Sequence, residues 1–455
     1  MSANASSEST NSKSPPRLSD IPGENGMPIF GNTFKMIKDP VGFGTYMRNK
    51  YGDVYRTNSF FRDNVSMLGP EANEFVLMDK GKNLSSEKGW APYLAKLFPR
   101  GLMLIDFDEH RAHRHIMAAA FKTEPMKGYM ERLNDAMPER IAAWGKTGSF
   151  EFYPAIKKLT LDMATVVFLG LEPNAETKKI NKALTDMVAA SMGVVRIPIP
   201  GTLMARGVAG RKFMNQFLKA EIPQRRGSDK TDIFTRLCNA ADDDGNTFTD
   251  QEIVDHMIFL WMAAHDTITS SVTTLVYELG RNTKWQDKLR NEINGLSLND
   301  NRLSYTKMND LPLTEYAIKE ALRMNPPVPA MPRQTVRDIE FKGHRIPKDT
   351  VVGVSTVATH RDSNIWDKPD QFDPMRFSPE GGVKERHRYA WIPFGGGAHM
   401  CLGLHFAYMQ TKVIMTHLLP QYEIVLPENY TTKFQIMPII KPVDGLPVSL
   451  RPVLS

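Results

Sequence analysis

The amino-acid sequence predicts a mainly α-helical fold with a small β portion. Apolar residues recur at helical spacing through most of the chain, and one such stretch, from 250 to 279, is long enough to cross a whole domain. Strand-like patterns are confined to short segments. The chain has 455 residues, of which 41% are hydrophobic, so it can bury a large core.

The predicted elements follow in order. Residues 53–69 are expected to form a strand pair, because aromatic and β-branched residues surround the turn-like segment Arg62-Asp63-Asn64. From Pro70 onward helical spacing dominates. The predicted helices cover residues 108–145, 151–171, 176–193, 207–225, 250–279, 282–296, 312–325 and 402–419. Polar or Pro-rich loops are predicted at 196–202, 239–249 and 360–400, and short strands at the C-terminus.

The helix predicted from 250 to 279 has clear end signals. Thr249 and Glu252 form a capping box, and Gly280 is a natural stop. At 1.5 Å per residue this helix spans about 45 Å. It is rich in apolar residues and carries no heptad repeat. We therefore expect it to cross the middle of the molecule.

Composition narrows the function classes. The net charge is +6, and no basic run interleaved with aromatic residues is visible, so a nucleic-acid partner is not expected. The two cysteines, Cys238 and Cys401, are too few for a disulfide framework or an all-cysteine zinc site. Unpaired cysteines are typical of a reducing compartment, and the protein is expected to be cytoplasmic.

The first residues are polar and rich in Ser, Asn and Pro, with no apolar run. This pattern is neither a signal peptide nor a membrane anchor. We expect residues 1–20 to form a flexible polar tail and residues 21–455 to form one domain.

Residues 391–403, WIPFGGGAHMCLG, form a glycine-rich loop that presents one cysteine just before a helix. The positive end of that helix and nearby backbone N–H groups favour a thiolate at Cys401. A phosphate-binding loop would need Gly-Lys-Ser/Thr after the glycines, and the chain has Ala398-His399 instead. A zinc site would need more ligands nearby.

This loop resembles the haem-binding signature of the cytochrome P450 family, Phe-x-x-Gly-x-Arg/His-x-Cys-x-Gly. All five fixed positions match, at Phe394, Gly397, His399, Cys401 and Gly403. The resemblance implies the P450 fold, with the long helix over a haem b group. It also implies that Cys401 is the axial ligand of the haem iron, that Phe394 packs beside the sulfur, and that His399 contacts a haem propionate. Electron donation from such a thiolate favours O–O cleavage.

A second match lies at residues 320–323, EALR, where Glu320 and Arg323 are one helical turn apart. Taken alone, this spacing describes a weak surface ion pair. The resemblance implies a buried structural network instead, joined by Arg376 of the segment FDPMRF.

A third match, AAHDTITS at 263–270, lies on the long helix and is similar to the oxygen-activation motif of the family. Asp266 and Thr267 would deliver protons there. The alternative is an acid and a hydroxyl exposed on a helix, but the flanking residues are apolar. Ala264 stands where glycine is commoner, and His265 is given no role.

A fourth match supplies further candidates for cofactor binding. His110 and Arg114, in DEHRAHRHIMAAAF, are one turn apart on a predicted helix. Donor groups at this spacing suit carboxylates. The resemblance implies that they bind the haem propionates, together with Arg333.

The resemblance implies a monooxygenase, which inserts one oxygen atom of O2 into a hydrophobic substrate and releases the other as water. A peroxygenase, isomerase or dehydratase of the same fold is less favoured, because such relatives commonly lose the Asp–Thr pair. A non-catalytic haem-thiolate sensor is also less favoured, because no effector or DNA-binding motif is visible.

The sequence contains no flavin- or nicotinamide-binding domain, so electrons are expected from a separate ferredoxin or flavodoxin-like protein with its reductase. By resemblance, an apolar pocket would take a small lipid, sterol, terpenoid or retinoid-like molecule. The implied lining residues are Trp90, Tyr93, Leu97, Phe98, Met257, Trp261, Met331, Met437 and Ile439.

Overall fold

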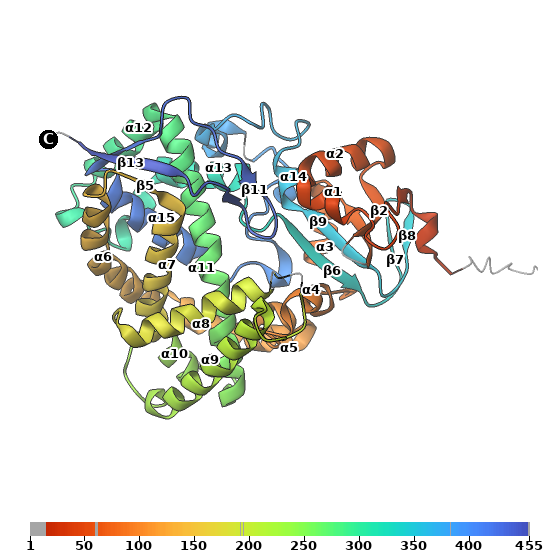
Figure 1. Cartoon of the computed structure of the whole chain (residues 1–455), viewed down its shortest axis with the longest axis horizontal. Coiled ribbons are helices and arrows are strands. Elements are labelled where there is room, and N and C mark those ends of the chain that lie inside the picture. The colour runs from red at the N-terminus through yellow and green to blue at the C-terminus, as the bar shows by residue number, and fades with distance from the viewer. Residues whose placement is uncertain (1–14, 60–61, 192, 194, 383, 454–455) are drawn as a thin grey trace, which may run out of the picture.

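The computed structural model describes residues 15–59, 62–191, 193, 195–382 and 384–453. Helices form most of this structure, and the strands gather mainly at one side of it (Figure 1). The mainly α-helical prediction is therefore confirmed. The helices are α1 Thr33–Lys38, α2 Pro40–Tyr51, α3 Pro70–Met78, α4 Ser86–Leu94, α5 Phe107–Ala118, α6 Thr123–Gly145, α7 Phe152–Leu169, α8 Ala175–Ser191, α9 Leu203–Arg225, α10 Ile233–Asn239, α11 Asp250–Arg281, α12 Thr283–Gly295, α13 Pro312–Met324, α14 Thr356–His360 and α15 Leu404–Leu418.

The strands form one larger sheet and three small ones. The larger sheet has the order β1-β2-β3-β9-β6-β4, and a smaller one has the order β10-β13-β5. β11 pairs with β12, and β7 pairs with β8. The strands are β1 Gly23–Glu24, β2 Val54–Ser59, β3 Arg62–Met67, β4 Leu84–Ser85, β5 Ser149–Glu151, β6 Ala330–Thr335, β7 Ile339–Phe341, β8 His344–Ile346, β9 Val351–Ser355, β10 Tyr422–Val425, β11 Phe434–Gln435, β12 Lys441–Pro442 and β13 Pro447–Pro452.

Helix α11 runs through the helical part of the molecule (Figure 1). It has 32 residues, and at 1.5 Å per residue it is about 48 Å long. The predicted capping box is present, because the Thr249 and Glu252 side chains bond each other's backbone N–H groups. α11 packs against α7, α9, α12, α13 and α15, and most of its residues are buried in the main core. A helix surrounded in this way can carry residues into the middle of the fold.

The structure differs from the predictions at two places near the N-terminus. β2 and β3 pair as expected, but Arg62, Asp63 and Asn64 lie in β3 rather than in a turn. The connection falls at 60–61, outside the described residues. Of the tail expected over residues 1–20, residues 1–14 also lie outside them, while Leu18 packs against the core under the larger sheet.

Local chemistry explains two other differences. The helix expected over 108–145 is divided, because the chain is extended at Lys122 before α6 begins. Pro125 lacks an N–H, which suits the first turn of that helix, where this donor would have no partner. α9 begins at Leu203, earlier than predicted, because the Thr202 side chain caps it by accepting the Ala205 N–H at 3.1 Å.

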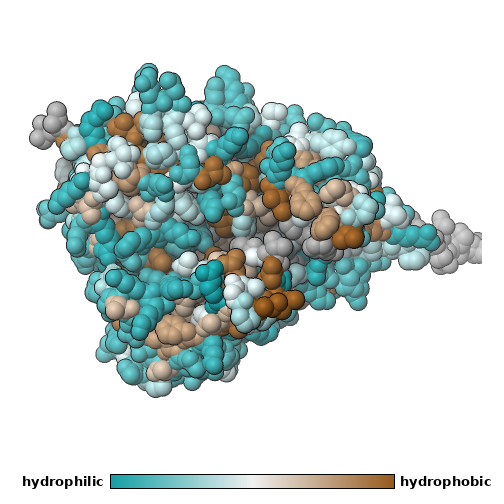
Figure 2. All heavy atoms as spheres, in the orientation of Figure 1, coloured by the Kyte–Doolittle hydropathy of each residue, from teal (hydrophilic) through white to brown (hydrophobic). Residues whose placement is uncertain are grey.

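The face drawn in Figure 2 is largely hydrophilic. Apolar side chains gather there over the loop between α8 and α9, where Val195, Ile197 and Ile199 are exposed. None of the described helices has both the length and the apolar composition needed to span a bilayer.

Candidate active site

A closed backbone loop presents Cys401 shortly before α15. The Cys401 N–H donates to the Phe394 carbonyl at 2.9 Å, which closes the loop. Gly397 has a φ of 61°, and a Cβ there would overlap the Leu77 carbonyl, so this position requires glycine. α15 begins two residues later than predicted, with Gly403 as its N-cap. Cys401 therefore sits in the turn that enters the helix.

Cys401 combines an exposed surface with surroundings rich in protein atoms. The residue is exposed, yet burial raises the pKa of its thiol, against the opposing effects of the Gly403 N–H and of Arg114. The sulfur can therefore meet a group that binds inside the fold. A thiol with a raised pKa stays protonated at neutral pH, so a thiolate here needs a metal or a cation as partner.

Four predicted cofactor-binding residues gather beside this cysteine. His110 and Arg114 come from α5, Arg333 from β6 and His399 from the cysteine loop, and all four interact electrostatically with one another or with Cys401. The ring centroids of His110 and His399 are 3.9 Å apart. Burial and the neighbouring cations lower the pKa of His110 to about 4 and that of His399 to about 2. Burial also lowers the pKa of Arg333, to about 10.

We call these four residues the donor cluster, because they offer several hydrogen-bond donors and include no carboxylate. Asp106 lies 3.8 Å from His399 Nε2, but it also accepts the Ser86 N–H at 2.8 Å. His110 Nε2 is buried and has no hydrogen-bond partner within the described residues. Buried donors of this kind are stabilised by an anion. The donor cluster therefore suits a ligand that carries carboxylates.

Phe394 contacts Cys401 through the backbone hydrogen bond from the Cys401 N–H to the Phe394 carbonyl. The Phe394 ring packs against Tyr408, with centroids 5.6 Å apart. It also lies 6.1 Å from the Trp391 ring. These contacts hold the ring of Phe394 in an aromatic group at the base of the loop.

The motif on α11 divides between two sides of the helix. Ala263, Ala264 and Thr267 are partly exposed, whereas His265 and Asp266 are buried. Residues three and four apart share a helix face, but consecutive residues do not. Thr267 therefore lies with the two alanines on the accessible side of α11, and the burial of Asp266 places it toward the interior.

The two members of the predicted acid–alcohol pair contact different partners. Lys157 Nζ of α7 donates to Asp266 Oδ1 at 3.0 Å, and His265 Nδ1 lies 3.3 Å from the same oxygen. The Thr267 hydroxyl donates to the Ala263 carbonyl at 2.7 Å. The Asp266 carboxylate is thus bonded to a side chain of α7, and the Thr267 hydroxyl is bonded to the backbone of its own helix.

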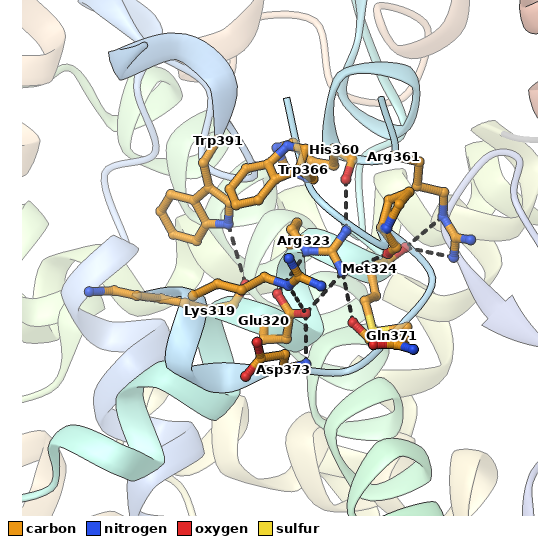
Figure 3. Close-up of polar contacts among 12 residues, drawn as sticks. Lys319, Glu320, Arg323, Met324, His360, Arg361, Trp366, Gln371, Asp373 and Trp391 are labelled. Atoms are coloured by element: carbon orange, nitrogen blue, oxygen red, sulfur yellow. Dashed lines mark hydrogen bonds and ion pairs between the residues drawn. The ribbon is translucent and has the colours of Figure 1, made fainter. Parts of the chain in front are cut away.

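Glu320, Arg323 and Arg376 meet in a buried ionic network. Figure 3 shows Glu320 and Arg323 in it. Arg323 donates through Nε to Glu320 Oε2 at 2.7 Å and through Nη2 to Oε1 at 2.9 Å. Arg376 Nε lies 3.3 Å from Oε1, and the Asp373 N–H donates to the same oxygen at 3.0 Å. One buried carboxylate is thus shared by two guanidinium groups and a backbone N–H.

This network is connected to the cysteine loop. Arg323 Nη1 donates to the His360 carbonyl at 2.8 Å (Figure 3), and His360 Nε2 accepts the Ile392 N–H at 2.8 Å. Burial lowers the pKa of His360 to about 3, so its ring is neutral and Nε2 can accept. Trp391 Nε1 donates to the Lys319 carbonyl at 3.3 Å. Two contacts therefore tie α13 to the residues that lead into the loop.

Sequence reasoning missed Lys157, His265 and His360. No local signal marks them, because each acts through a partner far away in the chain or through its place in a tertiary contact. The sequence suggests no role for His265, but its two ring nitrogens lie 3.3 Å from Asp266 Oδ1 and from the Lys157 carbonyl.

The expected pocket lining needs a correction. Leu97, Phe98, Met257 and Trp261 are almost fully buried in the main core, so they present no open surface to a ligand. The other five residues are partly exposed: Trp90, Tyr93, Met331, Met437 and Ile439.

The comparisons with known proteins cover almost the whole chain. A family model described as "Cytochrome P450" matches residues 21–443. The chain is 37% identical to "Putative cytochrome P450 136" of Mycobacterium tuberculosis, over 96% of this chain and 89% of that protein. It is 25% identical to "Taxane 10-beta-hydroxylase" of Taxus cuspidata, over 95% of this chain and 89% of that protein.

A solved structure is similar over the same extent. It is described as "Retinoic acid bound cyanobacterial CYP120A1". The match has a TM-score of 0.88 and 26% sequence identity, and it covers 97% of this chain and 100% of the other. The arrangement of helices and sheets in Figure 1 is thus shared with that protein.

Proposed function

This chain belongs to the cytochrome P450 family, and from that premise we propose that it oxidises a small hydrophobic molecule of the lipid, sterol, terpenoid or retinoid type. The protein is a haem-thiolate monooxygenase that binds haem b, takes up O2 and substrate, and receives electrons from a redox partner. The site residues, the substrate class and the identity of the electron donor are the parts that we propose.

We propose that Cys401 is the axial ligand of the haem iron and that the donor cluster binds the propionates. The excess of donors over carboxylates, formed by His110, Arg114, Arg333 and His399, supports this assignment. The orphaned His110 Nε2 supports it as well, because a carboxylate would give that buried atom a partner. The exposed Cys401 is the one feature that carries the proposal.

When bound, haem supplies the activation of dioxygen, and thiolate donation favours O–O cleavage. The side chains of this protein would bind and orient the substrate, and they would supply protons. Thr267 presents its hydroxyl on the accessible face of α11, beside Ala263 and Ala264. The two small alanines leave room for substrate next to that hydroxyl. Asp266 would take up protons on the other side of the helix and pass them inward.

Thr267→Ala is expected to uncouple electron consumption from product formation. The hydroxyl would hold a proton beside the bound substrate, and its loss should let oxygen consumed by the enzyme be released as hydrogen peroxide. Product formed per NADPH consumed should fall by about 10-fold or more, since a positioned acid–base group typically contributes about 10²–10⁴-fold to a rate. The ratio is measured with peroxide assayed in parallel. An unchanged ratio would make the hydroxyl purely structural, whereas Thr267→Ser should keep most of the coupling.

The substrate class rests on the partly exposed apolar residues. Trp90, Tyr93, Met331, Met437 and Ile439 would surround a hydrophobic molecule with aromatic, thioether and branched side chains. The similar structure holds retinoic acid, and one relative is named as a taxane hydroxylase, which supports the same class.

For the electron donor we propose a ferredoxin, or a flavodoxin-like protein, with its reductase. The net charge of +6 favours acidic carriers. Both cysteines are unpaired, which supports a cytoplasmic location.

Reconstitution tests this function. Hydrophobic candidates are first screened by the shift of the haem Soret band, and the best binder is then incubated with NADPH. We expect no product with NADPH alone, and product once a ferredoxin and its reductase are added. Rapid turnover with NADPH alone would contradict the need for a partner. Turnover driven only by hydrogen peroxide would favour a peroxygenase, and no product under any condition would favour a sensor.

A further inference from the structure

A polar pocket lies beside the ionic network of Glu320, away from the donor cluster. It has a volume of about 280 Å³ and is formed by the stretch of short turns between residues 373 and 386. Its polar lining comes from Asp373, Arg376, Ser378, Glu380, Gly381 and Arg386. Because Arg376 belongs both to this lining and to the Glu320 network, a group bound in the pocket would contact that network directly.

The Arg386 guanidinium is held in place at the pocket. Its Nη1 donates to the Arg376 carbonyl at 2.9 Å, and its Nη2 donates to the Gly381 carbonyl at 2.8 Å. Its Cζ lies 4.8 Å from the centroid of the buried Trp366 ring. Within the described residues, Nε has no hydrogen-bond partner and no carboxylate forms an ion pair with this group. A cation fixed before a ligand arrives lowers the entropy cost of binding that ligand.

Arg376 and Ser378 add two further donors. Arg376 Nε lies 3.3 Å from Glu320 Oε1, and Nη2 donates to the Lys368 carbonyl at 3.0 Å, whereas Nη1 has no partner in the described part of the chain. Ser378 is 1% exposed, and its Oγ is buried without a hydrogen-bond partner among the described residues. A buried hydroxyl without a partner costs stability, and an oxygen of a ligand would satisfy it.

The balance of buried charge near the pocket is positive. Three guanidinium groups lie around one buried carboxylate, that of Glu320. Arg323 and Arg376 are ion-paired with it, and Arg386 interacts with it from farther away. Burial, together with the neighbouring Arg376, lowers the pKa of Arg386, so its charge would gain from an anion nearby.

Two acidic residues also line the pocket, but neither neutralises its arginines. Asp373 accepts the Met375 N–H at 3.1 Å and thereby caps the turn that follows it. Glu380 is exposed to solvent. Among the described residues, neither acid forms an ion pair with Arg376 or Arg386. The two guanidinium groups therefore remain available to a ligand.

We propose that this pocket binds a phosphate group through Arg376, Ser378 and Arg386. The three donors without partners, Arg376 Nη1, Ser378 Oγ and Arg386 Nε, belong to three different side chains. A tetrahedral phosphate offers oxygens in several directions, whereas the two oxygens of a carboxylate lie in one plane. Guanidinium groups bind phosphate through short, charge-assisted hydrogen bonds. This site goes beyond the proposed oxidation, and inorganic phosphate and phosphate monoesters share the chemistry that it recognises.

Equilibrium dialysis of the haem-loaded protein against radiolabelled inorganic phosphate, at an ionic strength fixed with sodium chloride, tests the proposal. We expect saturable binding of one phosphate per chain. Ser378→Ala and Arg386→Gln should each weaken this binding by about 10-fold or more, because each removes a hydrogen bond to a charged group. Ser378→Ala should fold at least as well as the wild type, since the hydroxyl that it removes has no partner to lose.

Arg388→Gln is the matched control. Arg388 is an exposed arginine two residues beyond Arg386, and it lies near the Tyr389 ring instead of in the pocket. Its removal lowers the net charge as much as Arg386→Gln does, so it reports the effect of overall charge alone. Phosphate affinity should stay at the wild-type value in this variant.

Thermal unfolding gives a second measurement that needs no turnover. A ligand that binds only the folded protein raises its Tm, but phosphate also stabilises proteins by exclusion from their surface. The general effect should be equal in all four proteins, so only the wild type and Arg388→Gln should show an additional rise. Glycerol 3-phosphate and acetate replace inorganic phosphate in parallel samples. A larger rise with glycerol 3-phosphate would identify a monoester as the ligand.

Two results would overturn the inference. Equal phosphate affinity in the wild type, Ser378→Ala and Arg386→Gln, or binding that does not saturate, would show an adventitious ion only. An equal rise of Tm with acetate would show that the pocket does not select phosphate. If Arg386→Gln fails to fold, Ser378→Ala still decides between these outcomes. Neither measurement depends on the oxidation, so failure of the proposed function would leave both unchanged.

Discussion

Cys401→Ser is expected to abolish thiolate ligation and product formation completely. The wild-type protein, reduced and bound to carbon monoxide, should show the shifted Soret band that is typical of thiolate-ligated haem. Serine has nearly the same size, but its hydroxyl does not ionise at neutral pH, so it cannot supply the same electron donation. Absorption spectra of the purified, haem-loaded variant give the measurement. An unchanged band would refute the assignment of Cys401.

The second cysteine provides the control. Cys238 is buried in the main core, and burial raises the pKa of its thiol to about 12, so it stays neutral and inert. Cys238→Ala removes that thiol without placing a new polar group in the core. The variant should keep the wild-type spectrum, with at most a modest loss of thermal stability from the smaller side chain.

Glu320→Ala is expected to give protein that folds poorly and retains little haem. The carboxylate balances Arg323 and Arg376, and both would be left as buried, uncompensated charges. Breaking a buried ion pair from one side typically costs about 3–5 kcal/mol, which is a large share of the stability of a domain. Because Arg323 also bonds the His360 carbonyl, the residues that enter the cysteine loop should loosen as well. Urea unfolding and haem content per chain are the measurements.

A surface pair with the same spacing is the matched control. Glu124 and Lys127 are also three residues apart on a helix, with a contact of 2.7 Å, but both are exposed. Glu124→Ala should change the free energy of unfolding by less than about 1 kcal/mol and leave haem content unchanged. If Glu320→Ala behaves like this control in both measurements, the buried network is dispensable and its assigned structural role is wrong.

The features that can be predicted from the sequence are those encoded by short-range spacing. Glu320 and Arg323 are one turn apart, and the glycines beside Cys401 mark a turn that only glycine can adopt at Gly397. The capping box of α11 is likewise local, so the start of this helix at residue 250 is predicted correctly. Such signals can be interpreted from the sequence because residues that are close in the chain are also close in space.

The features that cannot be predicted depend on how helices pack against one another. Lys157 meets Asp266 only because α7 packs along α11 in one particular register, and an ordinary lysine on an amphipathic helix gives no sign of it. The same holds for Trp261 and Met257, which the family resemblance implies for the pocket but which are buried in the core. Rotation of a helix about its axis decides between these two outcomes, and an apolar residue alone does not reveal that rotation.

Haem binding by the donor cluster beside Cys401, as proposed, would make the stability of the fold depend on the supply of haem. His110, Arg333 and His399 come from distant parts of the chain, so a ligand that binds them together stabilises the folded state by mass action. At a free concentration of about 1,000 times its dissociation constant, such a ligand adds about 4 kcal/mol. When iron is scarce and haem synthesis falls, more chains would open and be degraded. The amount of folded enzyme would then follow the supply of haem.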